Sequence, residues 1–178
     1  MIRALRLLSI ALVIALTGCA ASVNHSGNQE SILQTTATAP TKLVMTVSGS
    51  PAMEASDDWV AFCEEWQTSM TAATAAAKLD FVYAGNKNTN LADAARLVQV
   101  KVNDFRYVSQ AKRYGLGVLT GNAFMDVDVD FTDLPSAQKL GSRKFATSSS
   151  AWQGVFAAMT PKQVEAVSAE IVRTVAKK

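Results

Sequence analysis

The chain has 178 residues, with 17 Lys and Arg against 15 Asp and Glu, and a formal net charge of +2. Its single histidine, His25, lies in a polar stretch near the N-terminus. The rest of the chain therefore lacks a histidine to activate a serine or cysteine nucleophile or to bind a metal ion. No serine stands in a G-x-S-x-G sequence, the pattern of hydrolase nucleophile elbows.

The first 18 residues have the parts of a bacterial export signal. Two arginines precede an apolar run over residues 7–16, which is too short to span a bilayer comfortably as a permanent helix. The run leads into Leu16-Thr17-Gly18-Cys19, which resembles the lipobox of bacterial lipoproteins. The resemblance implies cleavage between Gly18 and Cys19, and an N-acyl group and an S-diacylglycerol on Cys19. An ordinary secretory signal with an incidental cysteine is the alternative.

The residues after Cys19 predict where the chain is held. Ala20 stands where an aspartate would favour retention in the inner membrane, so we expect an outer-membrane anchor facing the periplasm. Residues 20–40 are mostly small and polar, so residues 19–40 are predicted to be a lipidated cysteine and a flexible tether. Several acyl chains give stable attachment without a spanning helix, and no other cofactor is expected.

Loss of the signal changes the charge balance. It removes two arginines, which leaves 17 − 2 = 15 Lys and Arg against 15 Asp and Glu. A neutral mature chain has no surplus of cations for phosphates, so nucleic acid is not expected as a partner. Once Cys19 is acylated, Cys63 has no cysteine to pair with, and its place on an apolar helical stripe predicts a buried thiol.

Residues 41–178 are predicted to form one α+β domain that begins with a strand and a helix. Residues 42–48 have the composition of a buried strand. A helix is expected over 57–78, with Ser56 as its N-cap and two aspartates in its first turn. Its apolar positions recur at spacings of three and four, which predicts one buried face: Trp59, Cys63, Trp66, Met70, Ala73 and Ala77.

Four further strands and two helices are expected after that helix. The strands are predicted over 79–84, 96–108, 122–133 and 139–146, the second and third with strict alternation of apolar and polar residues. Helices are expected over 149–159 and from Thr160, where Thr160-Pro161-Lys162-Gln163 has the pattern of a capping box. The order β-α-β-β-β-β-α-α predicts a four- to five-stranded, mostly antiparallel sheet with helices packed on one face.

Asp126, Asp128 and Asp130 alternate along one face of the predicted strand 122–133 and are the one local cluster of acids. The segment lacks the glycine turn and distal glutamate of a calcium loop. We expect a solvated strand face, paired with Lys101 or with cations of the next strand: Lys139, Arg143 and Lys144. Cation binding by the three aspartates and acid–base catalysis are the alternatives.

The connection 109–121 is rich in glycine and unusually apolar, and it does not have the spacing of a dinucleotide fingerprint. Exposed apolar loops mark contact sites for proteins or membranes. The predicted partner-binding residues lie in this loop and just before it: Tyr107, Lys112, Arg113, Tyr114 and Leu116.

The second half of the chain resembles a known family. It contains F-R-Y-V, then G-N-A-F-M-x-V-x-V-x-F, S-x-A-W-Q-G-V-F and T-P-K-Q-V. These segments resemble the uncharacterised bacterial envelope lipoproteins of the domain of unknown function 4410 type. The resemblance implies an envelope lipoprotein of similar architecture and transfers no catalytic residue.

Together these patterns favour a non-enzymatic accessory lipoprotein that binds a protein or another envelope component at the periplasmic face. One alternative is an envelope hydrolase that uses carboxylates, with Asp126, Asp128, Glu64 or Glu65 in that role. The other is a lipoprotein that binds a cation or small ligand through the aspartate row. The sequence predicts no oligomeric state.

Overall fold

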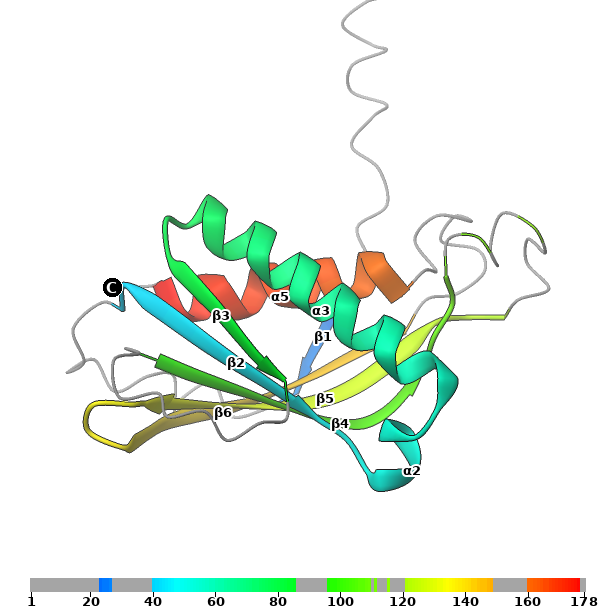
Figure 1. The fold of residues 1–178 in the computed structure, drawn as a ribbon, viewed down its shortest axis with the longest axis horizontal. Helices are drawn as coiled ribbons and strands as arrows, with labels where there is room; N and C mark the ends of the chain where they lie inside the picture. The colour runs from blue at the N-terminus through cyan, green and yellow to red at the C-terminus, as the bar shows by residue number, and fades with distance from the viewer. Residues whose placement is uncertain are drawn as a thin grey trace, which may run out of the picture.

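The structure is a computed structural model, and it describes residues 23–26, 40–85, 96–109, 111, 115, 121–148 and 160–176. In these ranges six strands form one sheet in the order β1-β6-β5-β4-β2-β3 (Figure 1). The strands are β1 (Val23–Ser26), β2 (Lys42–Ser48), β3 (Asp80–Gly85), β4 (Arg96–Arg106), β5 (Phe124–Asp133) and β6 (Gln138–Ser148). The helices are α2 (Pro51–Glu54), α3 (Asp57–Ala76) and α5 (Thr160–Ala176).

The sheet is mixed, with antiparallel pairs in the majority. β4, β5 and β6 form the expected antiparallel meander, and β1 pairs with β6, also in antiparallel orientation. β2 runs parallel to both of its neighbours, β3 and β4. Between β2 and β3 the chain passes through α3, because parallel neighbours need a long crossover connection. The predicted α+β fold with a mostly antiparallel sheet is confirmed.

Strand β1 makes the sheet one strand larger than predicted. Its four residues belong to the stretch predicted as a tether, and they pair with residues 144–147 of β6. The short stretch Val23–Ser26 has little apolar character of its own, so its strand conformation depends on the edge that β6 offers.

The core lies between the sheet and the two long helices. α3 and α5 contact each other and cover the same face of the sheet (Figure 1). Every second residue is buried from Arg96 to Val102 of β4 and from Met125 to Phe131 of β5, as the alternation predicted. In β4 the alternation of burial ends at a bulge after Val102. The apolar stripe of α3 differs from the prediction, because Phe62 is fully buried while Trp59 and Cys63 are only partly buried.

The first turn of α5 also differs from the expected capping box. Thr160 Oγ1 accepts a hydrogen bond from the backbone N–H of Val108 (2.8 Å). The Gln163 side chain is fully buried and turned into the sheet, where it accepts from Thr147 Oγ1 (3.1 Å) and donates to the carbonyl of Ala123 (2.8 Å). The two residues that suggested a cap therefore join the helix to the end of β4, to the residue before β5 and to β6.

Some expectations fall outside the described ranges. These are the signal and its cleavage site at Gly18 and Cys19, the helix over 149–159, and the loop residues Lys112, Arg113, Tyr114 and Leu116. In the part of the chain that is described, no helix is long and apolar enough to cross a membrane.

Candidate functional site

The aspartate row lies on the face of the sheet that points away from α3 and α5. Asp126, Asp128 and Asp130 alternate along β5 with the buried residues Val127 and Val129. They meet cations of β6: Lys144 Nζ lies 3.0 Å from Asp126, and Lys139 Nζ lies 2.8 Å from Asp130. These contacts confirm the expected pairing across the strands.

Uncharged side chains complete this network. Asn103 Nδ2 on β4 donates to Asp126 (3.2 Å) and to Asp128 (2.7 Å), and Ser142 Oγ on β6 donates to Asp130. Each of the three carboxylates therefore has a partner on a neighbouring strand. A solvent-facing sheet with such cross-strand pairs is stabilised modestly, by tenths of a kcal/mol for each pair.

Two groups of this network, Asp130 and Lys144, have shifted pKa values. Partial burial raises the pKa of Asp130, but hydrogen bonds from Lys139 and Ser142 and the charges of Lys139 and Lys101 outweigh it and lower the pKa below its usual value. The pKa of Lys144 is raised by its hydrogen bond to Asp126 and by the charge of that carboxylate. Both shifts favour the charged forms, which is typical of a paired surface and opposite to the raised carboxyl pKa that a general acid needs.

The prediction that Arg143 pairs with the aspartate row is wrong. It was expected to pair with these aspartates, but alternation places it on the covered face, opposite Val129. There its guanidinium lies 3.6 Å from Glu170 of α5, which also pairs with Arg173. The side chain therefore ties the sheet to the helix and does not face the acidic row.

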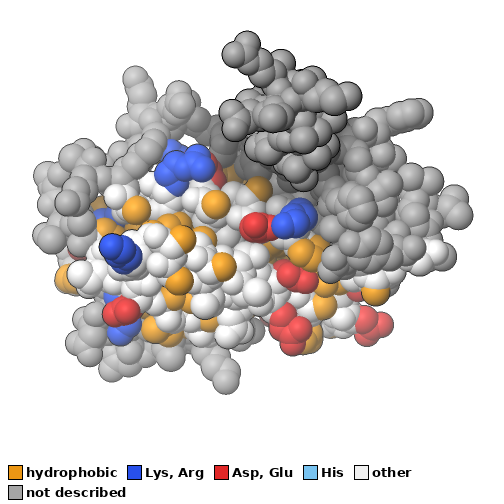
Figure 2. Space-filling model, turned by 90° about the horizontal axis from the view of Figure 1, so that it is seen from above, with side chains coloured by type: hydrophobic (Ala, Val, Ile, Leu, Met, Phe, Trp, Pro, Cys, Tyr) orange, Lys and Arg blue, Asp and Glu red, His pale blue; other side chains and the backbone are white. Residues whose placement is uncertain are grey.

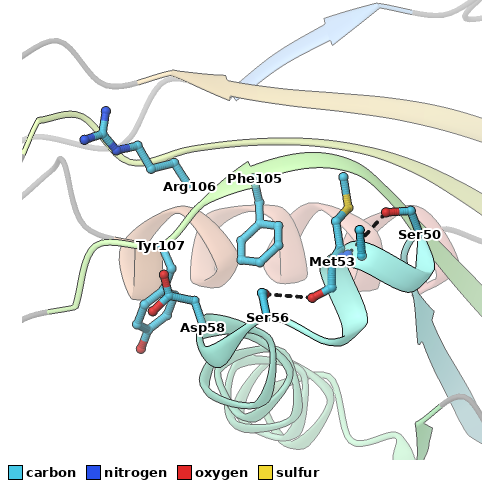
Figure 3. Close-up of a pocket in the computed structure, with 8 residues that line it drawn as sticks. Ser50, Met53, Ser56, Asp58, Phe105, Arg106 and Tyr107 are labelled. Carbon is cyan, nitrogen blue, oxygen red and sulfur yellow. Dashed lines mark hydrogen bonds between the residues drawn. The ribbon is translucent and has the colours of Figure 1, made fainter.

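A second candidate site is an open groove where α2, the start of α3 and the end of β4 meet (Figure 3). It has a volume of about 480 Å³, within the usual range for binding pockets. The residues that line it are Ser50, Ala52, Met53, Ser56, Asp58, Phe105, Arg106 and Tyr107. Of the predicted partner-binding residues, Tyr107 is described and lies here.

Aromatic packing holds the floor of this groove. The Phe105 ring stacks on Phe62 at a centroid distance of 4.4 Å and meets the edge of Trp59 at 5.9 Å. Met53 also packs against the core. Since Phe62 is fully buried, Phe105 has a fixed support, and the floor is apolar and preformed.

The residues at the start of the short helix α2 fix its position. Ser50 Oγ caps it by accepting from the Met53 N–H (3.3 Å), and Pro51 occupies the first turn. Gly49 lies against Trp59, where a Cβ would come within 2.9 Å of the indole ring, so this turn requires a glycine. The chain consequently turns sharply after β2 and brings α2 beside the end of β4.

Two carboxylates lie at the other side of the groove: Asp58 lines it, and Glu65 contacts its lining residue Tyr107. Tyr107 Oη donates to Glu65 Oε1 (3.3 Å). Burial raises the pKa of Tyr107 to about 12, assisted by the negative charges of Glu65, Asp58 and Glu64. Figure 3 shows Arg106 pointing away from Asp58 and Tyr107, and its guanidinium lies over Gly121. The groove therefore combines an apolar floor with one lining carboxylate, Asp58, and one lining cation, Arg106.

Of the residues that line this groove, only Tyr107 was predicted from the sequence as a partner-binding residue. Ser50, Met53 and Ser56 are ordinary turn and cap residues, and Phe105 ends an otherwise regular strand. One usable signal existed: residues 43–77 contain five carboxylates and neither lysine nor arginine. Figure 2 shows Asp and Glu side chains gathered at the lower right, the end of the molecule where α2 and α3 begin.

Cys63, predicted to be buried, is half-buried on α3 and is the free cysteine in the described ranges. Burial raises the pKa of its thiol, although a hydrogen bond with Tyr83 on β3 works against this. A raised thiol pKa disfavours the reactive thiolate. The structure thus places Cys63 in the packing between α3 and the sheet.

The mixed sheet with two helices across one face is an α+β architecture known from other proteins. Neither a protein-family model nor a curated protein matches the sequence. Solved structures do share the fold. A dodecamer of a PelC variant from Paraburkholderia phytofirmans matches at 12% identity and a TM-score of 0.53, covering 88% of this chain and 99% of that one.

A second PelC dodecamer from the same organism matches at 11% identity, with a TM-score of 0.51 over 89% of this chain and 99% of that one. Protein XCC0632 from Xanthomonas campestris has a TM-score of 0.49 at 12% identity, covering 88% of this chain and 92% of that one. At these identities the likeness to PelC shows a common fold and nothing finer.

Proposed function

We propose that the chain is a lipoprotein of the outer membrane, held at the periplasmic face through acylated Cys19, whose domain binds another envelope protein and catalyses no reaction. The observation that carries this proposal is the N-terminal sequence, in which two arginines, an apolar run and Leu16-Thr17-Gly18-Cys19 follow in order. The resemblance to lipoproteins of the domain of unknown function 4410 type adds support from the second half of the chain.

A binding role is supported by one feature of the domain and by one structural neighbour. The groove beside α2 offers a preformed apolar floor with polar groups around it, a combination typical of contact sites. PelC, which shares the fold, crystallised as a dodecamer. We extend this to the present chain as a proposal: the domain works through contacts between protein subunits.

The carboxylate-dependent alternatives have less support. Asp126 and Asp130 each have a lysine ammonium within 3.0 Å, which competes with a metal cation for the same oxygens. The pKa of Asp130 is lowered, whereas the acid of a glycosidase pair needs a raised pKa. Glu65 accepts a hydrogen bond from Tyr107 at the rim of the groove.

Lipidation is tested by comparing the wild-type chain with Cys19→Ser, using Cys63→Ser as the matched control. Mass spectrometry of the N-terminal peptide should show three acyl chains on Cys19, and the protein should fractionate with outer membranes. Cys19→Ser should lose the lipid and leave the membrane fraction, while Cys63→Ser should keep both. A wild-type protein that is cleaved elsewhere and carries no fatty acid would overturn the proposal.

A further inference from the structure

Strand β1 begins close to the residue that carries the proposed lipid. Only residues 20–22 separate Cys19 from Val23, the first residue of β1. An extended chain advances at most about 3.6 Å per residue, so the Cα atoms of Cys19 and Val23 lie within about 15 Å of each other. This limit follows from the length of the covalent chain alone.

The pairing of β1 with β6 fixes this part of the chain to the sheet. All four residues of β1 pair in antiparallel register, from Val23 opposite Thr147 to Ser26 opposite Lys144, and α5 also contacts β1. As a flexible coil, the tether predicted over residues 19–40 would have an average reach of about 25 Å. Because β1 is paired, only the link of residues 20–22 remains between the lipid and the sheet. A bilayer that holds the lipid therefore lies close to the start of β1.

The register of the sheet shows which end of the domain this is. Val23 pairs with Thr147, and Thr147 pairs with Met125 of β5. Met125 in turn pairs with Phe105 near the end of β4. Neighbouring strands are about 4.8 Å apart, so this row crosses from β1 to β4 in roughly 14 Å. Phe105 lines the groove, so the groove and the start of β1 lie at the same end of the sheet.

We propose that β1 holds this end of the sheet against the lipid surface of the membrane. We call it the anchored end: the start of β1, the end of β6, the start of β5 and the end of β4. The inference rests on the proposed lipid at Cys19 and adds an orientation to it. Gln138, at the other end of β6, lies roughly 30 Å from Thr147 along the strand and points away from the membrane. A protein that binds in the groove consequently does so at the membrane surface.

Disulfide trapping tests the pairing of β1 in the full-length protein with Cys63→Ser. Asn24→Cys/Ala146→Cys should form a disulfide within one chain on mild oxidation, because the two residues are directly opposite and such pairs have a suitable Cα separation. Asn24→Cys/Ser142→Cys is the matched control, since Ser142 lies four residues away along β6, roughly 13 Å from Ala146. Mass spectrometry of the peptides measures both. Equal oxidation of the two pairs would show that β1 behaves as a free tether and would overturn the inference.

Fluorescence quenching tests the orientation on the membrane. The lipidated protein, again with Cys63→Ser, is inserted into vesicles of phosphatidylethanolamine and phosphatidylglycerol that contain lipids with a nitroxide on the headgroup. A fluorophore is attached to Ala52→Cys, an exposed residue of the groove, or to Gln138→Cys, also exposed. The label at residue 52 should be quenched about threefold more strongly, because the ends of β6 are roughly 30 Å apart.

Two insertions identify the link that orients the domain. A Gly-Ser segment of about 12 residues, with an average reach of roughly 20 Å, is placed either between Ser22 and Val23 or between Ser26 and Gly27. The first insertion lengthens the connection between the lipid and β1, so it should abolish the difference in quenching between the two labels. The second lies beyond β1 and should leave the difference unchanged, which makes it the matched control.

The outcomes separate this inference from the proposed anchor. Equal quenching of the two labels without an insertion, or equal effects of the two insertions, would overturn the orientation. If the protein binds the vesicles through its lipid and shows either result, only this inference fails. If it carries no fatty acid on Cys19 and does not float with the vesicles, the proposed anchor and the orientation fail together.

Discussion

The two faces of the sheet are built from the same strands but are held in different ways. On the covered face, β5 buries Met125, Val127, Val129 and Phe131 against α3 and α5. Three aspartates of the same strand, each directly after one of these buried residues, point to the open face. There they contact lysines of β6 and Asn103 of β4. Because side chains alternate along a strand, a shift of one residue exchanges burial for ion pairing.

The difference between the two faces shows which contacts stabilise the domain most. A fully buried large side chain contributes several kcal/mol, whereas an exposed ion pair contributes between 0 and about 1 kcal/mol. The open face can therefore change in sequence at little cost in folding, while the covered face cannot. The groove lies at the border of the two, with its floor supported by the core and its rim in solvent.

The largest effect is expected at Trp66, which is fully buried in the contact of α3 with the core. Trp66→Ala should lower the free energy of unfolding by about 3–5 kcal/mol, because it leaves a large cavity. Trp66→Phe is the control. The indole Nε1 has no hydrogen-bond partner among the described residues, so this change should cost clearly less. Urea denaturation of each variant measures both values, and equal losses would contradict this account.

Gln163 tests the polar connection through the covered face. Gln163→Leu should lower the free energy of unfolding by about 1–3 kcal/mol, because it leaves the Ala123 carbonyl and the Thr147 hydroxyl without this partner. In a double-mutant cycle, Thr147→Val should cost less in the Gln163→Leu background than in the wild type. Additive losses would show that the two side chains do not act together.

A smaller effect, dependent on pH, is expected at Asp130 on the open face. Its folded pKa is lowered, so its contribution is present above the unfolded pKa and is lost as pH falls through the folded pKa. Asp130→Asn should cost less than about 1 kcal/mol at neutral pH and nothing at low pH. Denaturation of both proteins from pH 7 down to pH 2 measures the difference. A gap that widens on acidification would contradict the assignment.

Local patterns in the sequence predicted the elements well where one face of an element is buried along its length. Strands β4 and β5 alternate with period two, and Val164, Val167, Ile171 and Val175 line α5 at the period of a helix. Both periods are properties of the backbone, so they can be found without knowing what the element packs against. The short turn between β5 and β6 likewise favoured their antiparallel pairing.

Contacts between residues far apart in the sequence could not be predicted from local patterns. No local pattern distinguishes a β2 that lies at an edge from one that runs parallel between β3 and β4. Nor does the tetrad at residues 160–163 show that Gln163 enters the core, because its spacing fits a capping box equally well. The groove was not predicted for the same reason, because α2 ends at Glu54 and β4 ends only at Arg106.

The smallest effect is expected at Val60, which is 65% exposed on α3 between acidic neighbours. A β-branched residue at an exposed helix position loses side-chain freedom and gains little burial. Val60→Ala should therefore raise the free energy of unfolding slightly, by about 0.5 kcal/mol, through helix propensity alone. Urea denaturation of Val60→Ala and the wild type measures the difference, and a clear loss of stability would contradict this account.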